Sequence, residues 1–326
     1  MKKLWIVGVV SIIIGAALTV GALAVADFDI NKFTYGGKYM DKTRIIDDIP
    51  GTVRLNDENV RITVLPAKDD KITIRYEEND KYFYTIEEKS GVLEISSNRG
   101  KWRIISFDWS FHTPEVIIEI PKGYDGDLDI ISDNSNLSLE GIDFKNLHSS
   151  ISNGAVSVEE IKTSGECELI SSNGKISVSD SSFSEGMSVQ TSNSSIELEE
   201  LDARGKEITA VTSNGKLTAE ELYGDEINLK TSNAKIEISD ISARILEAVT
   251  SNGKIDFDGV DVSEKILFKT SNAEVSGEIL VDPRDYTINS YTTNASNNLL
   301  NNIGTANKSI DINTSNGAIN VSFTEK

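Results

Sequence analysis

The sequence is poor in the residue types on which several common protein classes depend. Its 326 residues include 1 cysteine and 5 prolines, and aromatic residues make up 7% of the chain. A single cysteine cannot form an internal disulfide, so packing and backbone hydrogen bonds must hold the fold in any redox compartment. Few aromatics beside 38% hydrophobic residues predict an ordered protein with a thin, mostly aliphatic core.

Histidine and positive charge are also scarce. His112 and His148 are the 2 histidines that a Ser-His-Asp or Cys-His arrangement could use. The formal net charge of −20 disfavours binding to a phosphate backbone, because such binding relies on clustered Lys and Arg. Gly-rich phosphate loops and paired Cys-x-x-Cys motifs are missing from the sequence. We therefore expect no nucleic-acid partner, no cofactor and no catalytic site.

One long apolar run is present, at the amino terminus. The segment 4–26 carries no charge and follows Lys2 and Lys3. At ~1.5 Å per residue, a helix of this length crosses the ~30 Å hydrocarbon core of a bilayer. The next charges are acidic, so the positive-inside rule predicts a cytoplasmic stub at 1–3 and an extracytoplasmic remainder. A cleaved signal peptide is the alternative, since residues 24–26 have the small-x-small form of a cleavage site.

An asparagine turn recurs along the rest of the chain at spacings of 19 to 22 residues. In most copies a serine precedes the asparagine and a glycine or alanine follows it. Self-similarity at such a period is typical of stacked repeats, in which each unit buries its apolar face against its neighbours. The asparagines are Asn134, Asn153, Asn173, Asn193, Asn214, Asn233, Asn252, Asn272, Asn294 and Asn316.

Within each copy, apolar residues alternate with polar ones, which is the period of half-buried strands and not of a helix. Asparagine tolerates the left-handed conformation, and its amides can bond along a ladder when strands stack at ~4.8 Å. We therefore predict an all-β fold, a single-stack parallel β-helix or β-solenoid of ~20-residue coils with Asn turns, preceded by one transmembrane helix. The inward set around Asn233 would be Ile227, Leu229, Ile236, Ile238 and Ile241.

The predicted organisation has five parts. Residues 49–125 keep a strand-like pattern but lose the Asn register and gain aromatics. A cap is expected there because the end of a solenoid needs cover for its apolar cross-section and its unpaired edge. The parts are a cytoplasmic stub at 1–3, a transmembrane helix at 4–26, a juxtamembrane linker at 27–48, an irregular N-terminal β region or cap at 49–125 and the Ser-Asn repeat β-solenoid at 126–326.

The repeat sequences resemble those of a known family. Turns reading T-S-N-G-K-I and S-S-N-G-K-I, the segment IIEIPKGY at 117–124 and a single amino-terminal anchor are similar to the LiaG-like and YvlB-like putative-adhesin proteins of Gram-positive bacteria. The resemblance covers 49–326. It implies a β-solenoid-like fold and, for some members, a place beside regulators of cell-envelope stress. It implies no catalytic residues.

Carboxylates follow the asparagines by six or seven residues. Stacked coils would place them along one edge, where like charges on neighbouring strands repel. Solvent, the lysines two residues after the asparagines, or a divalent cation would offset this repulsion, so the edge is either a solvated face or a weak Ca²⁺ or Mg²⁺ site. The Gly-rich nonapeptide of calcium-binding β-rolls is absent from the sequence. The candidate residues are Glu159, Glu199, Glu220, Asp240 and Asp258.

Aromatic residues gather in one segment of the expected cap. We predict this segment as a contact site, with packing under the cap as the alternative. Its residues are Trp102, Phe107, Trp109 and Phe111. Cys167 takes an inward position and is expected to be an inert core thiol. His148 should face solvent, and His112 should lie in a surface loop or in the cap.

The sequence therefore predicts a membrane-anchored extracytoplasmic β-solenoid that acts as a non-catalytic, adhesin-like binding module at the cell envelope. Its partner would be a cell-envelope component or a membrane protein, and its oligomeric state is open. An accessory regulator of a membrane envelope-stress sensor is the second interpretation, because Gly8, Gly15, Ala16 and Gly21 suit helix packing. A polysaccharide-acting β-helix enzyme is the third, but insertions between repeats are too short to build a groove.

Overall fold

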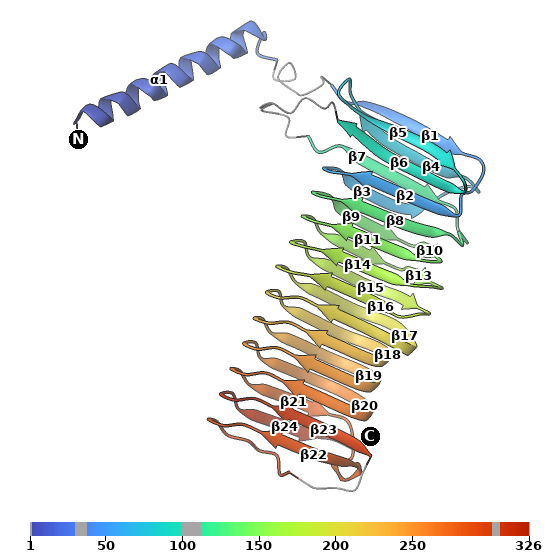
Figure 1. The fold of residues 1–326 in the computed structure, drawn as a ribbon, viewed down its shortest axis with the longest axis vertical. Helices are drawn as coiled ribbons and strands as arrows, with labels where there is room; N and C mark the ends of the chain where they lie inside the picture. Colours follow the sequence, from blue (N-terminus) through green and yellow to red (C-terminus); the bar gives the residue numbers. More distant parts are fainter. Residues whose placement is uncertain (1, 30–37, 100–111, 302–306, 326) are drawn as a thin grey trace.

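The protein is a long rod of stacked strands with one separate helix at its amino-terminal end (Figure 1). The computed structural model describes residues 2–29, 38–99, 112–301 and 307–325. Strands hold 59% of the residues and form a β-solenoid of about 9 turns, which confirms the predicted fold class. The helix α1 (Lys2–Val25) closely matches the span predicted at 4–26.

Each coil of the rod has one strand before its asparagine turn and one strand after it. The strands before the turns stack in parallel on one face, which we call the first sheet, and those after the turns stack on another face, the second sheet; longer strands join the two into one continuous sheet. The strands before the turns are β2 (Thr52–Asp57), β8 (Asp127–Ser132), β11 (Leu147–Ile151), β14 (Cys167–Ser171), β16 (Met187–Thr191), β22 (Tyr286–Tyr291) and β23 (Lys308–Asn313). The strands after the turns are β3 (Arg61–Pro66), β9 (Asn136–Glu140), β12 (Val156–Glu159), β15 (Ile176–Phe183), β21 (Val275–Ile279) and β24 (Ile319–Phe323).

The middle of the rod contains longer strands that pass round a corner and serve both sheets. They are β17 (Ile196–Val211), β18 (Leu217–Lys230), β19 (Ile236–Val249) and β20 (Ile255–Lys269). In the earlier coils, the short strands β10 (Asp143–Phe144) and β13 (Lys162–Thr163) lie beyond this corner, and the 3-10 helix η2 (Pro283–Asp285) precedes β22. The stacking is parallel throughout this region, so residues at one position of the repeat form a row along the rod.

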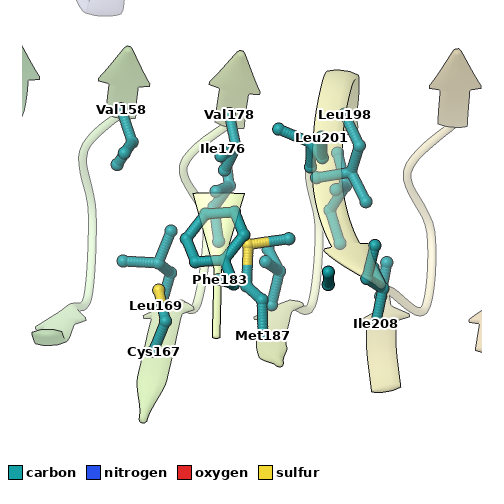
Figure 2. Packing of buried hydrophobic residues seen from close by; sticks show 14 of the residues in the cluster. Val158, Cys167, Leu169, Ile176, Val178, Phe183, Met187, Leu198, Leu201 and Ile208 are labelled. Atoms are coloured by element: carbon teal, nitrogen blue, oxygen red, sulfur yellow. The ribbon is translucent and has the colours of Figure 1, made fainter. Parts of the chain in front are cut away.

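The core of the rod consists of alternate residues from both sheets. Figure 2 shows Cys167, Leu169 and Met187 facing Val178 and Leu198 across the interior. All five residues predicted to point inward around Asn233 are buried. At ~1.5–3 kcal/mol for each fully buried aliphatic side chain, this alternation supplies most of the stability of a coil.

The order of coils along the rod departs from the order in the sequence at both ends. At one end, β2 lies between β8 and the later strand β6 (Val92–Arg99), and β3 lies between β9 and β7 (Glu115–Ile120). At the other end, β23 lies between β20 and the earlier strand β22. Asn316 therefore precedes Asn294 along the rod, the reverse of the order in the chain.

The amino-terminal end of the stack is covered by antiparallel strands. Strand β4 (Ile72–Glu78) pairs with β7 and with β1 (Met40–Ile46), while β5 (Tyr82–Lys89) pairs with β6. Strand β1 lies within the range expected to be a linker, 27–48. Its charged residues Asp41, Lys42 and Arg44 are exposed, as is common on strands that end a sheet and must not pair with another chain.

Candidate functional site

The most regular surface of the rod is the line of its asparagine turns, which we call the Ser-Asn ridge. Each side-chain nitrogen donates to the side-chain oxygen of the asparagine in the neighbouring coil, at 2.6–2.9 Å. Along the rod, the bonded residues are Asn59, Asn134, Asn153, Asn173, Asn193, Asn214, Asn233, Asn252, Asn272, Asn316 and Asn294.

This ladder gives the ridge a fixed chemical direction, because every amide donates toward the amino-terminal end of the rod. A ladder bond uses one of the two N–H groups and one of the two oxygen lone pairs of an amide. Each amide inside the ladder thus keeps a donor and an acceptor that the ladder does not use. The serine before most of the asparagines adds a hydroxyl group, and Ser213, Ser232 and Ser251 are exposed.

Buried hydroxyl groups support the ridge from below. Thr250 is 3% exposed, accepts a hydrogen bond from the Gly253 backbone N–H at 3.2 Å and donates to the Ala234 carbonyl at 3.2 Å. Thr212 makes the corresponding contacts in its coil. This threonine closes its own turn and joins it to the preceding coil, so it holds the asparagine in place.

Glycine follows the asparagine where adjacent turns approach most closely. A Cβ atom added to Gly215 would overlap the Ser194 carbonyl oxygen, and one added to Gly253 would overlap the Ala234 carbonyl oxygen. The preceding coils carry Ser194 and Ala234 at this position, whereas Gly174 follows Gly154, and a Cβ added to Gly174 would overlap the Gly154 carbonyl oxygen. Close approach of a carbonyl from the preceding coil therefore requires glycine at these positions.

The predicted acidic residues lie at the corner where the strand after the turn ends. Glu159, Glu199, Glu220 and Asp258 belong to one row, in which Ser179 and Ser239 also lie. Asp240 lies one residue further on, where the backbone is left-handed (φ 52°). All five candidates are exposed. The structure therefore divides the predicted edge into two adjacent rows.

The second acidic row contains Glu160, Asp180, Glu200 and Glu221 beside Asp240, all with φ between 50° and 53°. A hydrogen bond with Asp180 and the charges of Asp180, Glu221 and Glu199 raise the pKa of Glu200. Among the described residues, no group of three or more His, Cys, Asp or Glu is arranged to hold a metal ion. Cation binding at this edge stays a prediction.

The lysines two residues after the asparagines were one candidate for offsetting this charge, and the structure pairs them elsewhere. Lys235 contacts Glu237 at 2.7 Å and Asp256 at 2.9 Å, and Lys254 contacts Asp256 at 3.3 Å and Glu274 at 3.2 Å. These carboxylates lie on the outer face of the second sheet, nearer to the ridge. Within the described part of the chain, no ion pair joins these lysines to the five predicted edge residues.

A profile of the family described as Toastrack DUF4097 matches residues 52–221, more than half of the chain. The chain belongs to the Toastrack DUF4097 family. The match begins at β2, in the coil that lies between two coils from later in the chain, and ends in β18. The Toastrack pattern of strand, asparagine turn and strand continues beyond the match to β24.

Solved structures with likeness to this Toastrack protein are distant from it. A putative cell adhesion protein from Clostridium sporogenes ATCC 15579 is 11% identical over 89% of this chain and 100% of that one, with a TM-score of 0.29. A putative lipid binding protein from Parabacteroides distasonis ATCC 8503 is 15% identical over 88% and 96%, with a TM-score of 0.37. A putative adhesin from the same strain is 12% identical over 89% and 99%, with a TM-score of 0.37. No curated protein matches the chain.

The predicted aromatic contact residues lie outside the described part of the Toastrack protein. They are Trp102, Phe107, Trp109 and Phe111, in the segment 100–111. His112 follows this segment. Its Nε2 lies 2.8 Å from the Glu77 carboxylate, and its ring lies 5.0 Å from that of Tyr39. Their role as a contact site stays a prediction.

Cys167 and His148 lie on opposite faces of the first sheet. Cys167 is 4% exposed among aliphatic residues, and burial raises the pKa of its thiol. The His148 ring faces outward, with its Nδ1 2.9 Å from the Glu168 carboxylate. Because a sheet separates them, this thiol and this imidazole cannot act together as nucleophile and base.

Two features of the amino-terminal end escaped sequence reasoning. Asn59 is the first ridge asparagine in the described part of the chain, although the residues around it, Asp57-Glu58-Asn59-Val60, lack both the serine and the small residue of later turns. The Asp57 carboxylate is 2% exposed and accepts hydrogen bonds from the hydroxyls of Tyr82, at 2.5 Å, and Tyr84. Burial and the charge of Asp57 raise the pKa of Tyr84. From the sequence, the order of the end coils could have been found only by considering, for every asparagine in a turn-like segment, each coil that could lie next to it along the rod.

Proposed function

We propose that this Toastrack protein is a single-pass, membrane-anchored, extracytoplasmic binding module that displays a rigid, non-catalytic rod at the cell envelope. The observation that carries the proposal is the helix α1. Its segment Gly8–Val25 has a mean hydropathy of 2.4, and none of it is buried against the rest of the protein. An apolar surface of this length needs a lipid bilayer to cover it, and a signal sequence would look the same.

The distribution of charge supports display of the rod away from an anionic surface. Residues 1–108 hold 16 basic and 16 acidic residues, so the formal charge of −20 lies wholly on residues 109–326. The part of the rod near the helix is thus neutral, and the distal coils are acidic. A surface of anionic lipid would repel the distal coils and favour an upright rod.

Binding along the sides of the rod is supported by the way coils repeat the same chemistry. Repeat proteins present extended surfaces built from equivalent positions of successive units. Here each coil presents the asparagine of the Ser-Asn ridge, and the amides are already held in one orientation by the ladder. Prior fixation of this kind lowers the entropic cost of binding.

Within the family, we propose that the chain falls with the LiaG-like and YvlB-like members. The turns at 171–176 and 250–255, the segment 117–124 and the single amino-terminal helix support this assignment. The partner would be a component of the cell envelope or another membrane protein. The names of the similar proteins, adhesin, cell adhesion protein and lipid binding protein, agree with binding in general.

Cysteine labelling of intact cells tests the proposed topology, because Cys167 is buried and gives no background. A Ser232→Cys variant should react with a membrane-impermeant maleimide before lysis, whereas Lys3→Cys should react only after it. Mass spectrometry of the membrane fraction should recover residues 1–26 on the mature chain. Labelling of Ser232→Cys only after lysis would refute extracytoplasmic display, and release of a shortened chain into the medium would refute the anchor.

A second candidate function is regulation of a membrane-embedded stress sensor through the helix itself. It is favoured by Gly8 and Gly15, which lie seven residues apart on one face of α1 with no atom within 4 Å of where a Cβ would stand. Such positions allow close approach of another helix. Replacing α1 with an unrelated spanning helix should abolish stress signalling under this function and leave envelope binding by the rod unchanged.

A further inference from the structure

Beside the Ser-Asn ridge, a second row of outward side chains alternates in chemical character from coil to coil. This row, which we call the alternating row, holds the residue three positions before each asparagine. The register pairs its neighbours directly, so they form one line along the rod. In order, they are Asn56, Ile131, Ser150, Ile170, Gln190, Val211, Lys230, Val249, Lys269, Asn313 and Tyr291. From Asn56 to Lys269 an aliphatic residue recurs every second coil, or every ~9.6 Å, with a polar residue between, and the alternation ends at Asn313.

Packing in the core does not account for this alternation. The inward residue next to each row member does alternate in size in the later coils, from Ala210 to Leu229 and from Ala248 to Phe268. In the earlier coils, the inward neighbours of Ile170 and Gln190 are Leu169 and Val189, which are both large. The surface alternation is already present there, so its cause lies outside the core.

The alternating row also carries positive charge on an acidic rod. Lys230 and Lys269 are exposed, and among the described residues neither forms an ion pair. The lysines on the other side of the ridge, such as Lys235, are neutralised by neighbouring carboxylates. Lys230 and Lys269 lie two coils apart, ~9.6 Å. They are therefore available to an anionic group that recurs at that distance.

We propose that the alternating row and the Ser-Asn ridge together bind a linear glycan with a two-sugar repeat, in which one sugar of each pair carries a carboxylate. The proposal rests on the function proposed above and names its ligand class. The glycan would lie along the rod, with its carboxylates at Lys230 and Lys269 and its aliphatic ring faces at Val211 and Val249.

The chemistry of the ridge fits hydroxyl groups. A sugar hydroxyl both donates and accepts a hydrogen bond. Among the described residues, the side-chain amides of Asn214, Asn233 and Asn252 make only their ladder bonds, so each can still donate and accept one hydrogen bond. Successive sugars of an extended β-linked chain turn over, so the same ring face returns at every second sugar. A surface on which equivalent side chains recur at every second coil matches this symmetry. Many weak, equivalent contacts along a polymer together give a higher affinity than any one of them.

Other linear polymers fit the row less well. Nucleic acid has too dense a negative charge for a rod of −20. One carboxylate per ~9.6 Å is a far lower charge density than the one phosphate per ~1.7 Å of a DNA duplex, so the acidic coils repel such a glycan much less. An extended peptide repeats every ~6.6–6.8 Å and would lose register. A polyproline helix repeats every ~9.3 Å, but such ligands use aromatic-lined grooves, and the row is aliphatic.

The test uses the full chain in nanodiscs and fluorescence anisotropy of labelled oligosaccharides. A hyaluronan decasaccharide serves as the probe with a two-sugar repeat and one carboxylate per repeat. A chitin hexasaccharide serves as the neutral β-linked probe, which shares the alternation of ring faces and lacks the carboxylate. We expect saturable binding of hyaluronan that weakens with added salt and at least tenfold weaker binding of chitin. Absence of hyaluronan binding, or equal binding of the two probes, would overturn the proposal.

A charge-neutral exchange tests the period itself. The double variant Lys230→Val with Val249→Lys keeps the composition and net charge but changes the order of the row. We expect at least a fivefold loss of hyaluronan affinity in this variant. The control Lys162→Ala alters an exposed lysine on the short strand β13, away from the ridge, and should change the affinity less than twofold. Wild-type affinity in the double variant would show that charge alone attracts the glycan and would refute the periodic match.

Retention on isolated cell envelopes separates this proposal from the function on which it rests. If the full chain binds envelopes and the double variant binds them equally well, the binding module stands and the glycan row is wrong. If the wild-type chain does not bind envelopes at all, both are wrong. If a polyproline peptide competes with hyaluronan at equal concentration, the alternating row binds a peptide and the proposed glycan ligand is wrong.

Discussion

The buried threonine found beneath six of the ridge asparagines offers a direct measurement of what holds the turns together. Replacing Thr250 with valine keeps the shape and the β-branch and removes the hydroxyl. The Gly253 N–H then has no acceptor in a buried turn, which costs about 1–3 kcal/mol, and the bond to the Ala234 carbonyl is lost as well, at about 0.5–1.5 kcal/mol. We therefore expect local destabilisation of about 2–4 kcal/mol.

Hydrogen exchange resolves this effect better than global unfolding, because the stability of a repeat protein is a sum over coils and their contacts. At 1.4 kcal/mol per factor of ten, the Gly253 amide should exchange about 30- to 700-fold faster in Thr250→Val. Peptides from distant coils, such as 167–171, should be unchanged. The matched control is Thr218→Val, which changes a half-buried threonine on the outer face of β18. Valine suits a strand, so the control should alter exchange by less than threefold.

The reasoning is refuted if the two variants behave alike. Equal exchange at Gly253 in both would mean that the hydroxyl of Thr250 contributes no more than the methyl group that replaces it. The recurrence of threonine at this position would then reflect strand propensity. The asparagine ladder would be stabilised by its own hydrogen bonds without help from the threonine hydroxyl. A large effect that spreads to distant coils would contradict the additive picture of the rod.

Three further changes test other contacts of the rod. Gly215→Ala forces a Cβ into the carbonyl of the preceding coil and should cost about 1–3 kcal/mol in urea unfolding, whereas Ala234→Gly should cost about 0.5–1 kcal/mol. Hydrogen bonds from two lysines lower the pKa of Glu237. Ionised Glu237 therefore adds to the free energy of unfolding above the pKa that it has in the unfolded chain, and this contribution is lost as the pH falls through its pKa in the folded protein. Its side chain is 35% exposed, so acidification from pH 7 to pH 3 should destabilise wild type by only about 0.3–1 kcal/mol more than Glu237→Gln, as read from thermal melts. Tyr84→Phe removes a donor from the buried carboxylate of Asp57 and should cost about 1.5–3 kcal/mol at pH 7, and an unchanged urea midpoint would show that Tyr82 alone satisfies Asp57.

The middle of the rod was predictable because its period determines its geometry. Alternation assigns every residue to the core or to the surface, so the burial of Ile227 and Cys167 followed from position alone. A fixed coil length then places equivalent residues in rows. Both steps depend only on local pattern, which is why they hold from Asn134 to Asn272.

The ends and the ion pairs were not predictable in the same way. A period states which residues share a row, but it does not state which coil is the neighbour, so the exchange of Asn294 and Asn316 is invisible to it. Asn59 was missed because its turn has acidic neighbours instead of serine and glycine. The lysines near the ridge were one of three candidates for offsetting the charge of the edge carboxylates. Two acidic positions of the repeat compete for each lysine, and the strand after the turn brings the nearer carboxylate within reach.

The exchanged coils at the two ends change how the rod responds to pulling. A terminal coil that followed the chain order would be held on one side only and could peel away strand by strand. Here the last segment, β23 and β24, is wedged between β20 and β21 on one side and β22 on the other. A load applied at the carboxyl terminus must break contacts on both sides of that segment at once. Under the proposed anchoring by α1, this arrangement would resist tension applied along the chain.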